Sequence, residues 1–175
     1  MNLRNRIAEI RSKKDVDVLV NELESSPEFV GELLNLLKER RERQSLYASW
    51  VLMHLAENAP ELLNTFTTEL FDLFENSPHT GVNRNIMRIF MEIDIPEEIM
   101  SPLIDQCIHF IHEPLQPVAV KAFSLVTFAR IVIKEPDLAP ELKLAMENLH
   151  LHQSPALQSS SKKVRLMMKK NGIKF

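Results

Sequence analysis

The most informative segment of the chain is residues 117–142, which read PVAVKAFSLVTFARIVIKEPDLAPEL. Between Val118 and Ile133 the only charged side chains are those of Lys121 and Arg130. A helix that is apolar on nearly every side has to be covered by its neighbours. We therefore predict an inner helix of a helical stack here, followed by a proline-marked corner and the start of another helix.

Prolines recur along the chain at intervals that indicate a repeat. Pro78, Pro117 and Pro155 lie 39 and 38 residues apart, and the tetrapeptide Ala-Pro-Glu-Leu at 59–62 returns 80 residues later at 139–142. Two helices per unit of about 40 residues is the simplest period, and it lies within the range of helical-pair repeat proteins. Serine can cap a helix whose first residue is proline, and Ser-Pro pairs stand at 26–27, 77–78 and 154–155.

The second helix of a known repeat resembles part of this segment. Val120-Lys121, followed by Ser124-Leu125, Thr127-Phe128-Ala129 and Ile131, is similar to the HEAT-repeat pattern in which a Val-Arg pair leads into small residues and a Leu-Gly-x-Ile-like end. Elsewhere the pattern is degenerate: Asn83-Arg84 stands where Val-Arg would, and glycine is replaced throughout. The resemblance covers about Pro27 to Lys170 and implies an architecture without a specific activity.

This resemblance implies an all-α fold, a right-handed α-α superhelix of about four HEAT-like (armadillo-like) hairpins behind two N-terminal capping helices. We expect one domain over residues 1–175, with capping helices in 1–24 and a Ser12–Asp15 capping box between them. The expected hairpins are 27–58, 60–94, 97–134 and 137–171. Their expected helices are 27–39, 43–58, 60–75, 82–93, 97–112, 117–134, 137–149 and 157–170, after capping helices at 2–11 and 13–24.

The composition favours a folded protein of the cell interior. Hydrophobic residues make up 45% of the chain and there are only 3 glycines, which disfavours disorder and a glycine-rich phosphate loop. Cys107 is the only cysteine, so an internal disulfide and a thiolate metal site are excluded. The first residues lead into no apolar signal core, and there is no uncharged run long enough to cross a membrane. We expect a cytoplasmic protein without membrane contact.

Charges are segregated although the net charge is only −3. Bases gather in residues 1–14, 38–43 and 162–174, acids outnumber bases between Glu57 and Glu147, and no acid follows Glu147. This pattern is compatible with an acidic partner at the ends or with head-to-tail self-association. The plain alternative is a solvated helix surface.

One stripe of helix 43–58 combines aromatic and basic side chains. At about 100° per residue, Arg43, Tyr47, Trp50 and His54 fall on one face. Adding 80 to each of these residue numbers gives Phe123, Thr127, Arg130 and Lys134 in another predicted second helix. Adding 41 gives Arg84, Arg88, Met91 and Ile95.

Second helices line the concave side of HEAT-like stacks, so we hypothesise one inner wall that binds an acidic or aromatic-docking segment of a protein, or a nucleic-acid backbone. The alternative is that Tyr47 and Trp50 pack against the terminal helices while the arginines pair with Glu57, Glu92 or other acids. The predicted binding residues are Arg43, Tyr47, Trp50, His54, Arg84, Arg88, Arg130, Lys134, Lys162, Arg165 and Lys169.

Asp105, His109, His112 and Glu113 share another helical face, whose spacing permits a metal pair. The opposite face of that helix is uniformly apolar, which is typical of an ordinary exposed helix. No second ligand-bearing helix is evident, and closed sites need about four ligands. We therefore expect no metal here.

The sequence contains no recognisable nucleophile motif, phosphate loop or His-Glu-x-x-His, so we expect no catalytic residues and no cofactor. A DNA-glycosylase branch of HEAT-like proteins exists, but the negative net charge and the single tryptophan disfavour it here. We predict a non-catalytic scaffold that binds an unidentified protein. The alternatives are a nucleic-acid-binding module that uses the basic residues 162–170, and a homo-oligomer formed through the charged ends.

Overall fold

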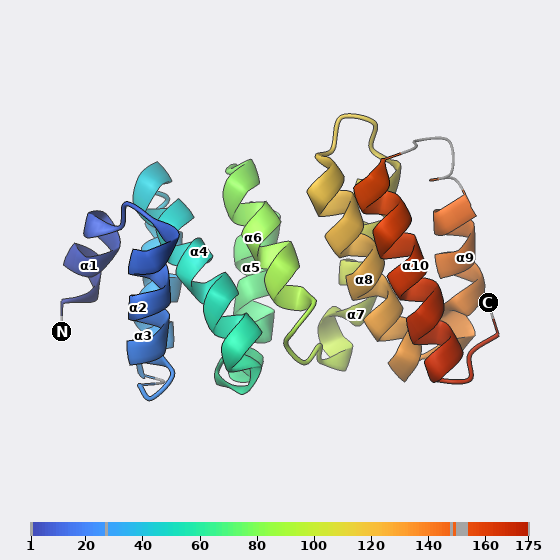
Figure 1. The fold of residues 1–175 in the computed structure, drawn as a ribbon, viewed down its shortest axis with the longest axis horizontal. Coiled ribbons are helices and arrows are strands. Elements are labelled where there is room, and N and C mark those ends of the chain that lie inside the picture. The colour runs from blue at the N-terminus through green and yellow to red at the C-terminus, as the bar shows by residue number, and fades with distance from the viewer. Residues whose placement is uncertain (1, 27, 148, 150–153, 175) are drawn as a thin grey trace. The chain divides into compact units, whose positions relative to one another are not determined.

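The computed structural model describes residues 2–26, 28–147, 149 and 154–174, which form helices and connecting segments without any strand (Figure 1). The chain divides into two compact units, residues 1–96 and residues 97–175. Each unit is organised around one 17-residue helix, which is α4 in unit 1 and α8 in unit 2.

Helix α4 (Glu42–Asn58) is the centre of unit 1 and contacts α1, α2, α3, α6 and the 3-10 helix η1. Small buried residues, among them Ala48, Ser49 and Ala56, allow these neighbours to approach α4 closely on several sides. The other elements of the unit are α1 (Leu3–Glu9), α2 (Lys13–Leu23), α3 (Glu28–Lys38), η1 (Pro60–Phe66), α5 (Thr67–Asn76) and α6 (Thr80–Phe90).

Two buried hydrogen bonds fix α4 against its neighbours in unit 1. The Ser45 hydroxyl donates to the carbonyl of Leu36 on α3 at 3.0 Å. On the other side, the Asn85 side-chain amide of α6 donates to the Ser49 hydroxyl at 2.9 Å. Both Ser49 and Asn85 are buried, so a slip of either helix would leave polar groups unsatisfied in the core. These bonds therefore set the register of α3, α4 and α6.

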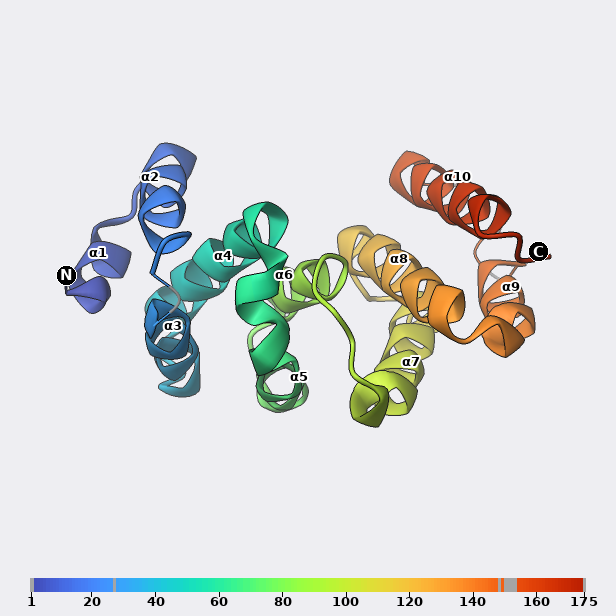
Figure 2. The same ribbon diagram turned by 90° about the horizontal axis from the view of Figure 1, so that it is seen from below.

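Helix α8 (Val118–Lys134) is the inner helix of unit 2, as its apolar sequence predicts. It lies against α7 (Glu97–His112), α9 (Ala139–Glu147), α10 (Pro155–Lys170) and the 3-10 helix η2 (Pro136–Leu138). Figures 1 and 2 both show α7 and α10 beside α8. Even Lys121, in its first turn, is only 5% exposed.

The sequence signals that predict where helices begin are confirmed in part. Ser12 caps α2 in a reciprocal capping box with Asp15, as predicted. Ser154 occupies the N-cap position of α10 with proline in the first turn, but its side chain makes no capping hydrogen bond. Ser77 follows α5, and the cap of α6 is His79. Pro27, the predicted start of the first hairpin, lies outside the described residues.

The two central helices show where the predicted repeat spacing needs correction. They begin 76 residues apart, at Glu42 and Val118, and each is followed by a proline that opens a 3-10 helix, Pro60 or Pro136. The repeated Ala-Pro-Glu-Leu is therefore not structurally equivalent, since its first copy follows α4 directly and its second begins α9. The predicted shift of 80 residues is four residues longer than the observed shift of 76. Four residues are about one helical turn, so the predicted shift still selects nearly the same face of α8.

Several further helix bounds differ from the prediction; for example, α6 begins at Thr80 and α10 begins at Pro155. The expected helix 60–75 is split into η1 and α5, and α6 ends at Phe90 instead of continuing to Ile93. Ile93 and Ile95 are buried in the segment after α6, where Asp94 is held by Asn64 and Thr67. Tertiary contacts thus end the helix early. The grouping into four hairpins of one superhelical domain stays a prediction.

Candidate functional site

Four side chains of α4 follow one another in contact along one face of the helix. The guanidinium carbon of Arg43 lies 5.4 Å from the centroid of the Tyr47 ring. The Tyr47 and Trp50 ring centroids are 6.3 Å apart, and those of Trp50 and His54 are 6.2 Å apart. We call Arg43, Tyr47, Trp50 and His54 the α4 stripe. Arg43 is exposed and the three rings are half-buried, so this series of contacts reaches the surface of unit 1.

Glu57 closes the far end of the α4 stripe. One of its carboxylate oxygens lies 2.8 Å from Nδ1 of His54, and the other lies 2.7 Å from the guanidinium of Arg88 on α6. The Glu57 side chain is 26% exposed, which strengthens both interactions relative to a fully solvated pair. The stripe therefore has an exposed cation at its first turn and a charge-compensated cluster at its last.

The predicted residues of α6 have different environments. Arg88 joins the α4 stripe through Glu57, which is the pairing that the sequence analysis kept as its alternative. Arg84 is exposed on the same helix, one turn earlier. Met91 and Ile95 lie beyond the end of α6, so the predicted stripe continues on this helix only as far as Arg88.

The predicted residues of unit 2 lie on α8 and α10. Arg130 is half-buried and Lys134 is the last residue of α8, while Lys162, Arg165 and Lys169 are exposed on α10. Thr127, which the shifted pattern placed in the wall, is fully buried and cannot belong to an open surface. The joining of these residues with the α4 stripe into one wall stays a prediction.

The polar face of α7 has the character of an ordinary exposed helix face. Asp105, His109 and His112 are exposed, whereas Leu103, Ile104, Cys107 and Ile111 on the opposite side are buried. No group of three histidine, cysteine or carboxylate side chains with a geometry for a metal ion occurs in the part of the chain that the structure describes. Burial raises the pKa of the Cys107 thiol well above its usual range, which favours the protonated, unreactive form.

Glu57 was named from the sequence only as an alternative partner of the arginines and was not among the predicted binding residues. It lies three residues after His54, which is a sequence signal for contact on one helix face. Its contact with Arg88 joins residues that are distant in sequence, and only the fold brings them together.

Among the described helices, none has both the length and the apolar character needed to cross a membrane. No curated protein and no solved structure matches the chain. A family model described as a HEAT repeat domain does match, over residues 3–168. Proteins of this kind are helical-repeat scaffolds that commonly mediate protein interactions. Because the match spans nearly the whole sequence and the described residues form packed helices, the chain belongs to the HEAT repeat domain family.

Proposed function

We propose that this protein is a non-catalytic scaffold that binds a segment of another protein along the α4 stripe. The observation that supports the proposal is the continuous contact from Arg43 through Tyr47 and Trp50 to His54, with the rings only half-buried. Tryptophan, tyrosine and arginine are the residues that most often dominate the binding energy of protein interfaces. A scaffold role also agrees with the family.

The side chains of the α4 stripe are held in place before a partner binds, which favours binding. Each ring is held by its neighbours, and His54 is held by Glu57, so little side-chain freedom remains to be lost when a partner binds. The partner would cover the exposed edges of Tyr47 and Trp50 with an apolar or aromatic side chain. Water excluded from these rings supplies the main free-energy gain.

Charge would orient the partner. Arg43 is exposed at one end of the stripe and Arg84 is exposed on α6, whereas Arg88 is compensated by Glu57. An acidic residue of the partner therefore fits best near Arg43 or Arg84. If successive helical pairs stack as the repeat pattern predicts, Arg130, Lys134, Lys162, Arg165 and Lys169 would extend the same basic surface.

The test is affinity capture from cell extract with quantitative mass spectrometry, using the wild-type chain and the variants Trp50→Ala and Arg43→Glu. We expect both variants to lose the same captured proteins. Leu144→Ala is the matched control because Leu144 is an apolar side chain that is 60% exposed on α9, in the other unit of the chain. An unchanged set of proteins for folded Trp50→Ala and Arg43→Glu would contradict the proposal. Arg88→Glu is a poor probe, because it would place two carboxylates together in unit 1.

A second candidate function is nucleic-acid binding by α10. Lys162, Lys163, Lys169 and Lys170 are exposed on this helix, and the sequence contains no acid after Glu147. Such binding would weaken steeply with salt because phosphate contacts release counterions, whereas binding on the α4 stripe would weaken little. Titration of labelled single- and double-stranded oligonucleotides at several salt concentrations separates the two.

Measuring the mass of the protein in solution over the same salt series tests self-association. Cell fractionation tests the cytoplasmic location that we propose.

A further inference from the structure

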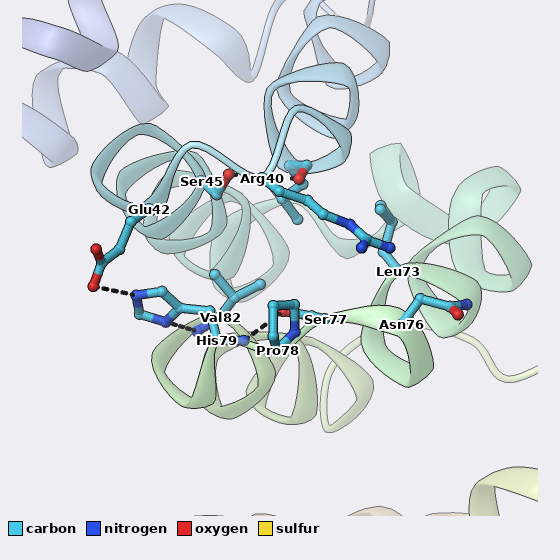
Figure 3. A pocket seen from close by; sticks show the side chains of 10 residues that line it. Arg40, Glu42, Ser45, Leu73, Asn76, Ser77, Pro78, His79 and Val82 are labelled. Atoms are coloured by element: carbon cyan, nitrogen blue, oxygen red, sulfur yellow. Dashed lines mark hydrogen bonds and ion pairs between the residues drawn. The ribbon is translucent and has the colours of Figure 1, made fainter.

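A cavity of about 310 Å³ opens at one end of unit 1 (Figure 3). It lies where the C-terminal ends of α3 and α5 meet the N-terminal ends of α4 and α6. The lining residues are Leu37, Arg40, Glu42, Ser45, Leu73, Asn76, Ser77, Pro78, His79 and Val82. This volume lies at the lower end of the range of pockets that bind small ligands, about 300–1,000 Å³, and suits one large apolar group.

The inner wall of the cavity is apolar. Leu37 and Val82 are 4% and 3% exposed, and Leu73 is half-buried beside them. The polar groups stand at the rim, where Figure 3 shows Glu42 and His79 on one side and Arg40 and Asn76 on the other. An apolar group that entered the cavity would therefore be flanked by charged side chains.

Among the described residues, Arg40 is the charged side chain of this rim for which no partner is found. The neighbouring bases are all engaged: Lys38 pairs with Glu69 at 2.7 Å, Arg41 pairs with Glu39 at 3.4 Å, and Arg43 lies over Tyr47. Within the described residues, the Arg40 side chain has no ion pair or hydrogen bond. Figure 3 shows it extended along the rim towards Leu73.

The backbone of Arg40 supports a role for its side chain. Its φ of 54° is in the left-handed region, and apart from glycine it is the only described residue with a positive φ. Glycine is the usual residue at such a position after a helix, because it adopts this conformation without strain. A strained arginine that faces a cavity motivates a functional hypothesis.

The opposite rim carries His79 and Glu42, whose side chains approach each other. His79 Nδ1 accepts hydrogen bonds from the backbone N–H groups of Gly81 and Val82 at 3.1 and 3.4 Å, which caps α6. Its Nε2 then faces Glu42 Oε1 at 3.8 Å (Figure 3). Among the described residues that line the cavity, Arg40 is the one arginine or lysine, so it is the rim group best suited to bind an added anion.

We infer that this pocket binds a large apolar side chain of a partner protein, with an adjacent acidic residue whose carboxylate pairs with Arg40. The apolar wall takes the side chain, and the unpaired guanidinium gives the complementary charge. The pocket shares no residue with the α4 stripe. The variants that test the pocket therefore leave the residues of the stripe unchanged.

The probe is a blocked peptide with a phenylalanine–glutamate pair flanked by glycine and serine, titrated into the full chain with labelled leucine and valine methyl groups. We expect saturable NMR shifts at Leu37, Leu73 and Val82. Two control peptides, with glutamine for glutamate or alanine for phenylalanine, should each bind more weakly.

Arg40→Gly is the decisive variant, because it removes the guanidinium and relieves the left-handed strain. We expect this variant to melt no lower than the wild type and to bind the peptide about fivefold more weakly, which is the size of one exposed ion pair. Arg41→Gln removes a neighbouring charge that does not line the pocket and should leave binding unchanged. Leu73→Glu, which offers Arg40 an internal carboxylate, should abolish binding.

Three results would overturn the inference: no shift at these methyl groups, equal binding of the three peptides, or equal effects of Arg40→Gly and Arg41→Gln. Octanoate is titrated in parallel as a small carboxylate with an apolar tail. If octanoate binds this pocket and the peptide does not, the occupant is a small molecule and the partner segment is wrong.

Discussion

The guanidinium of Arg88 on α6 lies 2.7 Å from the carboxylate of Glu57 in the last turn of α4. The pair joins two helices of unit 1 at the end of the α4 stripe, and the same carboxylate contacts His54. It therefore has a structural role and also orients one ring of the candidate binding surface. The buried Asn85–Ser49 hydrogen bond links the same two helices.

Replacing Glu57 should weaken unit 1. We expect Glu57→Gln to lower the free energy of unfolding by about 1 kcal/mol, because the pair is only partly screened by solvent. A double-mutant cycle with Arg88→Met, measured by urea unfolding, isolates the pairwise contribution. Glu61→Gln removes an exposed carboxylate just after α4 and is the control. Additive effects of Glu57→Gln and Arg88→Met would show that the ion pair does not stabilise the fold.

Two glycines in helices, Gly31 and Gly81, should respond differently to replacement by alanine. An added Cβ at Gly31 on α3 meets no atom within 4 Å, so Gly31→Ala should stabilise the protein by roughly 0.5–1 kcal/mol through helix propensity. At Gly81 the Cβ would lie 2.9 Å from Leu46 Cδ1 and 3.0 Å from His79 Cε1. We therefore expect Gly81→Ala to give no such stabilisation and to displace the side chain of His79, which caps α6. Thermal unfolding of both variants tests this, and equal stabilisation would contradict it.

Acid should weaken the N-terminal helices. Hydrogen bonds from the backbone N–H of Arg11 and from Ser12 lower the pKa of Asp15, and a hydrogen bond from Arg6 lowers the pKa of Glu22. A carboxylate whose pKa is lower in the folded state stabilises that state above its ordinary pKa, and this stabilisation is lost as the pH falls through about 4 and below.

The variant Asp15→Asn should therefore show a smaller loss of stability between pH 7 and pH 3 than the wild type, measured by urea unfolding at each pH. Asp17→Asn removes one negative charge from the same helix and controls for net charge. Identical pH profiles of the wild type and Asp15→Asn would refute this explanation.

Much of the fold follows from local sequence. The nearly uncharged segment from Val118 to Ile133 requires burial, and it forms α8 with bounds one residue from those predicted. The Ser12–Asp15 box and the contact face of α4 were also predictable, because both depend on residues within a few turns of one another.

The remaining features depend on contacts between distant segments. Helix α6 ends early because Thr67 and Asn64 hold Asp94, and Arg88 is compensated by Glu57 from another helix. The cavity beside Arg40 is formed by four helix ends that are adjacent only after folding. His79 acts as a cap because of the side-chain orientation in the folded chain, which its position next to a proline does not reveal.

The most direct test of the proposed binding surface uses the only tryptophan of the chain, Trp50. Incorporation of 5-fluorotryptophan gives a single ¹⁹F resonance, which is recorded as a captured partner is added. Because Trp50 lies in the middle of the α4 stripe, the account predicts that this resonance shifts or broadens until the complex is saturated. A resonance that stays unchanged while the complex forms would show that the partner binds elsewhere.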